Sequence, residues 1–159
     1  VNQGGMNVDL QIKGQNKNNL IRTIASTDMV GIGTGNPHST LHIASSQAGA
    51  YTSFTTTTYT VDDTHFIVDY QGSGNTNSVI TLPSPSGIAG RLYHLLNNSA
   101  GGGTLTVSTP SGVFLGAHLE NDSSTSIELT GDGSSRQMQG ISITSTGDNW
   151  FILHDGRSE

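Results

Sequence analysis

Histidine is the first residue type that could carry chemistry, because the chain has six histidines and no cysteine. His38 and His42 are four positions apart, a spacing that on a helix would place both imidazoles on one face for metal binding. Pro37 and the flanking apolar alternation instead place them on a turn and a strand. There His42 shares a face with Thr40, and three chains around an axis could bring their His42 side chains into a ring. The sequence has no His-x-His pair, and we predict neither a metal site nor a cofactor.

Acidic side chains are the second candidates, since a pair of carboxylates can hydrolyse a glycosidic bond. Four acids lie close in the sequence: Glu120, Asp122, Glu128 and Asp132. Asp122 and Asp132 fall in turn sequences, where such side chains cap the backbone. A chain of 159 residues also has little room for the long groove of a polysaccharide depolymerase. We therefore expect solvated turn acids, and depolymerase activity remains only an alternative.

Motifs for nucleophilic catalysis and phosphate binding are missing from the sequence. There is no Gly-x-Ser-x-Gly elbow. The glycines at 31, 33 and 35 are not followed by Lys-Ser or Lys-Thr, so we expect them to permit tight turns or close chain approach. Trp150, the only tryptophan, could stack on a sugar ring, but the apolar residues after it favour a core or interface anchor. We predict that the chain is not an enzyme.

Composition argues for assembly and against two classes of partner. Hydrophobic residues make up 32% of the chain and charged residues 11%, against about 45–50% and 25% in typical globular domains. So few core formers predict that oligomerisation covers the remaining apolar surface. The net charge of −6 with only six scattered basic residues disfavours nucleic acid. Apolar runs are short, so we predict no membrane insertion. The start at Val1, without a basic and apolar leader, suggests a fragment or processed product.

Residues 1–49 carry a loose repeat that predicts a stem of short strands. Apolar anchors fall about ten residues apart, and an isoleucine follows two positions after three of them, as on one face of a strand. Such units cannot cover their own apolar face, so they stack within one chain or three chains intertwine. With few spare apolar residues, intertwining is favoured. The predicted trimer core of this stem comprises Leu10, Leu20, Val30, Ile32, Leu41 and Ile43.

Residues 50–159 predict a head domain of many short strands separated by Gly, Pro and Asn turns, with no helical period. Alternating apolar and polar residues are typical of half-buried antiparallel strands. The overall prediction is all-β: an intertwined trimeric β-stem followed by a small antiparallel β-sandwich or barrel. The expected strands cover residues 51–60, 65–70, 78–82, 91–96, 104–108, 113–118, 126–130, 140–144 and 150–154.

Two parts of the chain resemble a known class of protein. Residues 30–43, VGIGTGNPHSTLHI, resemble the VGIGTxxPxxxLH[VI] segment in the shafts of bacteriophage tail and head fibres. Most of residues 59–153 is similar to a small β-domain at the ends of phage fibre proteins. That second resemblance rests on residues 60–63, 80–83, 90–93, 97–98 and 147–152, and it departs at residues 94–96, where an Ile-Lys pair is commoner.

The resemblance implies a homotrimer in an extracellular virion fibre, joined at its N-terminal side to other virion proteins. Its head would attach to a bacterial surface glycan or protein receptor. Polar loops offer hydrogen-bond acceptors and one forked donor for such contact, and from them we predict receptor-binding residues Asn121, Asp122, Asp132 and Arg136. The alternative within the same resemblance is a structural spacer or capsid-decorating fibre that binds no receptor.

Overall fold

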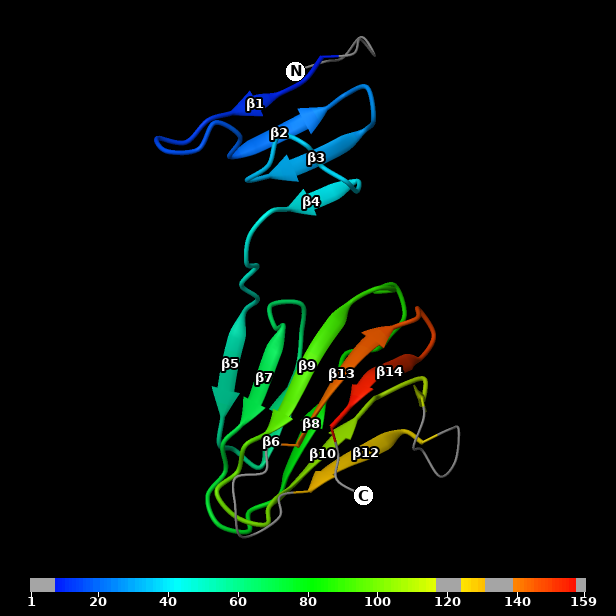
Figure 1. The fold of residues 1–159 in the computed structure, drawn as a ribbon. Helices are drawn as coiled ribbons and strands as arrows, with labels where there is room; N and C mark the ends of the chain where they lie inside the picture. Colours follow the sequence, from blue (N-terminus) through cyan, green and yellow to red (C-terminus); the bar gives the residue numbers. More distant parts are fainter. Residues whose placement is uncertain (1–7, 117–123, 131–138, 157–159) are drawn as a thin grey trace. The chain divides into compact units, whose positions relative to one another are not determined.

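The computed structural model describes residues 8–116, 124–130 and 139–156. Within these ranges the chain is all-β, which confirms the predicted fold class. No helix that could cross a membrane is found among them. The chain divides into two compact units, Val1–Ala48 (unit 1) and Gly49–Glu159 (unit 2), and Figure 1 shows the strands of each.

Unit 1 is one four-stranded mixed sheet with the strand order β1-β2-β3-β4. The strands are antiparallel from β1 to β3, whereas β4 runs parallel to β3. A parallel neighbour cannot be reached by a tight hairpin, so residues 33–40 form a crossover segment from the end of β3 to the start of β4. The strands are β1 (Gln11–Ile12), β2 (Ile21–Ile24), β3 (Met29–Ile32) and β4 (Leu41–Ile43).

Unit 2 is a sandwich of two facing sheets with its core between them (Figure 1). The six-stranded sheet has the order β11-β14-β13-β9-β7-β5, and the four-stranded sheet has the order β12-β10-β8-β6. Its strands are β5 (Tyr51–Phe54), β6 (Thr58–Thr60), β7 (Ile67–Tyr70), β8 (Ser78–Thr81), β9 (Leu92–Asn97), β10 (Thr104–Ser108), β11 (Phe114–Leu115), β12 (Ser126–Thr130), β13 (Gln139–Ser145) and β14 (Trp150–Asp155).

The first six strands of unit 2 alternate between the two sheets, and we call each pair of successive strands, one in each sheet, one turn of a coil. Strands β5, β7 and β9 pair in parallel in one sheet, and β6, β8 and β10 pair in parallel in the other. The prediction of an antiparallel sandwich is therefore wrong for this half. Residues 51–60, predicted as one strand, are split between β5 and β6, which lie in different sheets.

The last strands close the coil with antiparallel pairings. Strand β12 pairs with β10, and β13 pairs with both β9 and β14. The two ends of the coil therefore differ. At its start, β5 and β6 are edge strands, whereas at its end β9 and β10 are each paired with an antiparallel strand.

The core consists of side chains that alternate inward along facing strands. Trp150 is fully buried, and its ring centroid lies 5.6 Å from that of Tyr93. This confirms the prediction of a core anchor at Trp150 over the sugar-stacking alternative. Phe54 and Tyr59 stack at 4.4 Å near the other edge of the sandwich.

Loops on both sides of β8 and β10 stack as regularly as these strands. The side-chain oxygen of Asn75 accepts a hydrogen bond from the Gly102 N–H at 3.0 Å, and that of Asn77 accepts one from the Thr104 N–H at 2.9 Å. Each pair is 27 residues apart, as are the hydrogen-bonded hydroxyls of Ser84 and Ser111. The same spacing of 27 residues separates the paired residues of β7 and β9 and those of β8 and β10, so strands and loops share one register between these two turns of the sandwich.

Candidate functional site

One face of the unit 1 sheet is almost entirely aliphatic. Residues paired across neighbouring strands share a face, and the register aligns Ile12, Ile21, Ile32 and Ile43 in one row. A second row on this face contains Leu10, Thr23, Val30 and Leu41. We call the seven aliphatic residues of these two rows the aliphatic face.

The aliphatic face has no cover from the described residues of unit 1. Leu10 and Ile12 are each 42% exposed and Leu41 is 57% exposed, while the other four residues are half-buried. Among the described residues of unit 1, Gly31 alone is buried. This sheet therefore has no hydrophobic core of its own.

The crossover segment lies against the opposite face, over Gly31 on β3. A Cβ atom on Gly31 would come within 2.6 Å of the Thr34 carbonyl oxygen, and one on Gly35 would come within 3.3 Å of an Arg22 guanidinium nitrogen. Gly33 has a φ of 75°, a left-handed conformation that favours glycine. The Gly-x-Gly-x-Gly spacing thus permits a tight turn and close chain approach, as expected from the sequence.

The structure places five of the six predicted stem residues on the aliphatic face, and Leu20 is the exception. Leu20 is 43% exposed, lies in the bend before β2 and packs near Gly14. His42 is paired with Gly31 and therefore lies on the crossover side of the sheet. Its Nδ1 accepts a hydrogen bond from the His38 N–H at 3.3 Å.

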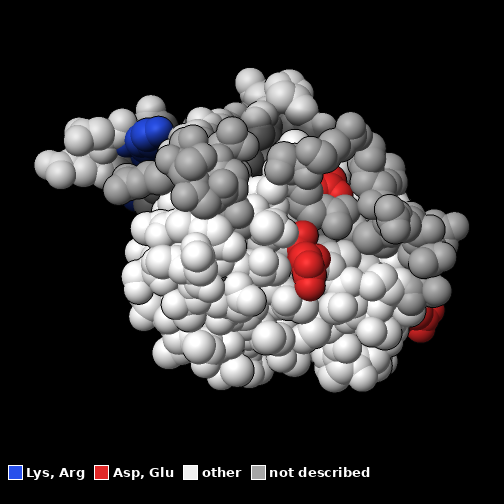
Figure 2. All heavy atoms as spheres, turned by 90° about the horizontal axis from the view of Figure 1, so that it is seen from below, with Lys and Arg blue, Asp and Glu red and all other residues white. Residues whose placement is uncertain are grey.

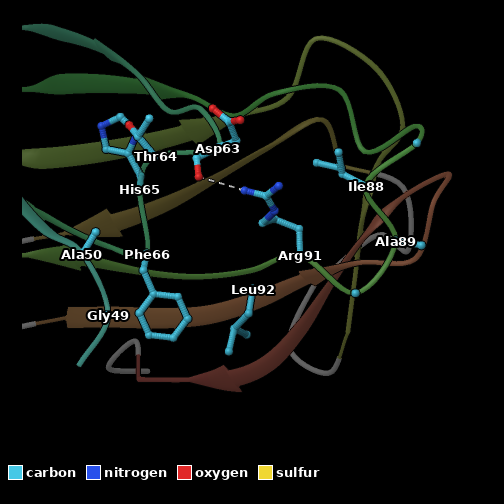
Figure 3. Close-up of a pocket in the computed structure, with 12 residues that line it drawn as sticks. Gly49, Ala50, Asp63, Thr64, His65, Phe66, Ile88, Ala89, Arg91 and Leu92 are labelled. Atoms are coloured by element: carbon cyan, nitrogen blue, oxygen red, sulfur yellow. Dashed lines mark hydrogen bonds between the residues drawn. The ribbon is translucent and has the colours of Figure 1, made fainter. Parts of the chain in front are cut away.

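Unit 2 carries a pocket of about 710 Å³ beside the segment that leads into β7 and the one that leads into β9 (Figure 3). In Figure 3 the Arg91 side chain lies between Phe66 on one side and Ile88 on the other, with Asp63 above it. Of the described residues that line this pocket, Arg91 is the one Lys or Arg. We call it the Arg91 pocket.

The pocket wall at residues 62–65 is held by a dense set of hydrogen bonds. The Asp62 Oδ1 atom accepts from the Thr64 N–H at 2.9 Å and from the Thr64 hydroxyl at 2.6 Å, and it lies 2.7 Å from His65 Nδ1. These hydrogen bonds, led by that of the Thr64 hydroxyl, lower the pKa of Asp62 to about 2. The Tyr93 hydroxyl donates to the Asp62 carbonyl at 2.9 Å.

His65 links this wall to the core. Its Nδ1 faces Asp62, and its Nε2 lies 2.7 Å from the Tyr59 hydroxyl. The order acid, imidazole, hydroxyl is that of a catalytic triad, but this hydroxyl belongs to a tyrosine that is stacked on Phe54. With only 10% of its side chain exposed, His65 is positioned to fix the loop.

Arg91 carries a guanidinium that is not neutralised by a carboxylate among the described residues. Its Nη1 donates to the Asp63 carbonyl oxygen at 3.0 Å. The Tyr93 hydroxyl is a second neighbour of the guanidinium, and the interaction with Arg91 lowers the pKa of Tyr93 against the larger effect of burial, which raises it. No described carboxylate forms a salt bridge with Arg91. Gly90, directly before it, has a φ of 82° and donates its N–H to the Ser145 carbonyl, which sets the entry into β9.

The predicted receptor-binding residues Asn121, Asp122, Asp132 and Arg136 lie outside the described residues, as does Glu120. Glu128 is exposed on β12, across from Thr106 on β10. Sequence reasoning did not single out Arg91 or Phe66. The available signal was Arg91 itself, a rare cation that directly follows Gly87-Ile88-Ala89-Gly90 at the start of a predicted strand.

Seen from below, the described surface is largely neutral, with Asp and Glu side chains separated from one another (Figure 2). No protein-family model, curated protein or solved structure matches the chain. The structure itself shows an all-β protein of two units. One is a four-stranded sheet without a buried hydrophobic core among its described residues, and the other is a sandwich of two sheets between which successive strands alternate.

Proposed function

We propose that the chain is a structural and adhesive component of a phage-like virion fibre. Three copies assemble through the aliphatic face of unit 1, and unit 2 is presented to a bacterial surface. The observation that carries the proposal is that unit 1 forms a regular sheet whose aliphatic face is not covered by the residues of unit 1 that the structure describes. A small sheet gains stability only when such a face is buried against another layer.

Two observations support further copies of this chain as the partners. The crossover segment occupies one side of the sheet, so the aliphatic side is the one left for a neighbour. A second and third copy offer the same apolar chemistry, and the resemblance of residues 30–43 to fibre shafts selects three. Other virion proteins would join at the N-terminal side.

The adhesive part of the proposal depends on repetition of weak sites. Three identical copies of unit 2 raise the apparent affinity by about 10²–10⁴ without strong individual contacts. The largely uncharged surface in Figure 2 has no cluster of Lys and Arg among the described residues and therefore does not suit a phosphate polymer, which needs clustered cations. A neutral or weakly charged glycan has no such requirement.

Light scattering of the full chain tests the assembly. The expected mass is three times the 16.6 kDa of one chain, and a monodisperse monomer would contradict the proposal. Binding of the purified trimer to host cells then separates an adhesive fibre from a spacer. A stable trimer that binds no cell and no glycan on an array would leave the spacer function.

A further inference from the structure

The Arg91 pocket combines one available cation with apolar walls. The guanidinium is anchored by a hydrogen bond to the Asp63 carbonyl, and no described carboxylate neutralises it. A planar guanidinium matches a carboxylate with two parallel hydrogen bonds, a geometry that lysine cannot provide. The pocket volume of about 710 Å³ lies within the usual range for small-molecule sites.

The surrounding charges limit the ligand to one negative group. Asp63 lines the same pocket, and its carboxylate has no hydrogen-bond partner among the described residues. Asp62 does not line the pocket, and its Oδ1 is occupied by Thr64 and His65. One arginine beside the Asp63 carboxylate can pair with one negative group, whereas the further charges of a polyanion would be repelled by Asp63. The Asp63 carboxylate can accept hydrogen bonds from neutral hydroxyl groups, so the charges favour a ligand that carries one carboxylate and several hydroxyls.

The apolar wall supplies a surface for the rest of the ligand. Phe66, Ile88 and Leu92 line the pocket on either side of Arg91 (Figure 3). The Phe66 ring is held edge-on to His94 at 5.0 Å, and it lies so close to Gly49 that a Cβ there would fall 1.9 Å from the ring. A ring fixed in this way can pack against the C–H face of a sugar.

We infer that the Arg91 pocket binds a carboxylate-bearing sugar, a uronic acid residue of a bacterial surface glycan. The Arg91 fork holds the carboxylate, Asp63 accepts from the sugar hydroxyls, and Phe66 packs against the ring. This inference rests on the proposed adhesive function, since that function supplies the glycan. It places the receptor contact at residues different from those predicted from the sequence.

The test is calorimetric titration of the full chain with a glucuronate-containing oligosaccharide. The matched neutral oligosaccharide, with glucose in place of glucuronate, should bind roughly tenfold to hundredfold more weakly because it lacks the charge-assisted pair. R91Q should lose the same factor for the acidic ligand and nothing for the neutral one. K17Q removes an equal charge from unit 1 and should leave both affinities unchanged.

A second variant protects the test against misfolding. If R91Q melts early, R91K keeps the charge without the fork and should still bind about tenfold more weakly than the parent chain. Equal binding of acidic and neutral ligands, or unchanged binding in both variants, would overturn the inference. So would equal, Arg91-dependent binding of a sugar phosphate, which would indicate a general anion site.

The failure of this inference can be told from the failure of the fibre proposal. If R91Q remains a trimer and attaches to host cells like the parent chain, the Arg91 pocket is not the receptor site and the fibre proposal stands. If the parent chain is a monomer, the fibre proposal fails, while the titration still reports on a pocket built entirely within unit 2.

Discussion

Gly31 and Thr34 lie so close that a single methyl group at position 31 would come within 2.6 Å of the Thr34 carbonyl oxygen. Because Gly31 has no side chain, the crossover segment can lie close against β3. The chain then continues into β4, which pairs in parallel with β3. The crossover segment therefore occupies one face of the unit 1 sheet and leaves the aliphatic face for a partner.

Gly31→Ala should therefore loosen unit 1. Backbone cannot move aside as a flexible side chain can, so we expect a loss of about 1–3 kcal/mol of stability per chain and a weaker trimer. Thermal melting with a mass measurement checks this. Gly14→Ala is the matched control, because a Cβ there would meet its nearest neighbour at 3.8 Å, an ordinary contact. If the two variants melt alike, the crossover packing is not what holds the unit.

Ile32→Ala tests the aliphatic face directly. Ile32 is the central residue of its row, between Ile21 and Ile43. If three copies bury it, removing its side chain should cost about 2–5 kcal/mol per chain. The parent trimer should also melt at higher temperature as its concentration rises, because assembly stabilises by mass action.

Ile24→Ala is the control for this experiment. By strand alternation, Ile24 lies on the crossover side of the sheet, opposite the aliphatic face. The same atoms removed there should leave the trimer mass and its concentration dependence unchanged. Equal losses in both variants would mean that the aliphatic face is not an interface.

Local patterns predicted the strands well, because alternation of apolar and polar residues reports on burial within one strand. The ranges 104–108 and 126–130 match β10 and β12 residue for residue. Alternation carries no information on which strand lies alongside, however, and a parallel partner one coil away looks the same as an antiparallel one. This is why the sandwich was expected to be antiparallel.

A signal for the parallel coil was present in the sequence but weak. The segments TLPS at 81–84 and STPS at 108–111 are 27 positions apart, and they occupy equivalent places in successive coils.

The Arg91 pocket was harder to predict from the sequence. It depends on a wall at residues 62–65 meeting a segment almost 30 positions later, and no local pattern encodes that meeting.

Asn77→Ala should weaken the coil in unit 2. The Asn77 side chain accepts from the Thr104 N–H, so its removal leaves that donor without its partner and should cost about 0.5–1.5 kcal/mol. Asn77→Asp retains an acceptor oxygen at the same place and should restore most of the loss. Chemical denaturation of the two variants distinguishes them, and an Asp variant as unstable as the Ala variant would argue against the stacked-loop explanation.

The pH dependence of unit 2 should be linked to Asp62. Hydrogen bonds from Thr64, the hydroxyl first, lower the pKa of this carboxyl from 3.8 to about 2. A group whose pKa is lower in the folded state stabilises the fold above its unfolded pKa and loses that contribution as the pH falls through the folded value. The free energy of unfolding should therefore decrease between about pH 4 and pH 2.

Asp62→Asn should flatten this decrease in acid-denaturation curves. Asp63→Asn should leave it in place, because the Asp63 side chain has no hydrogen-bond partner among the described residues. If the two variants titrate alike, the Thr64 hydrogen bonds do not set the acid sensitivity of this wall.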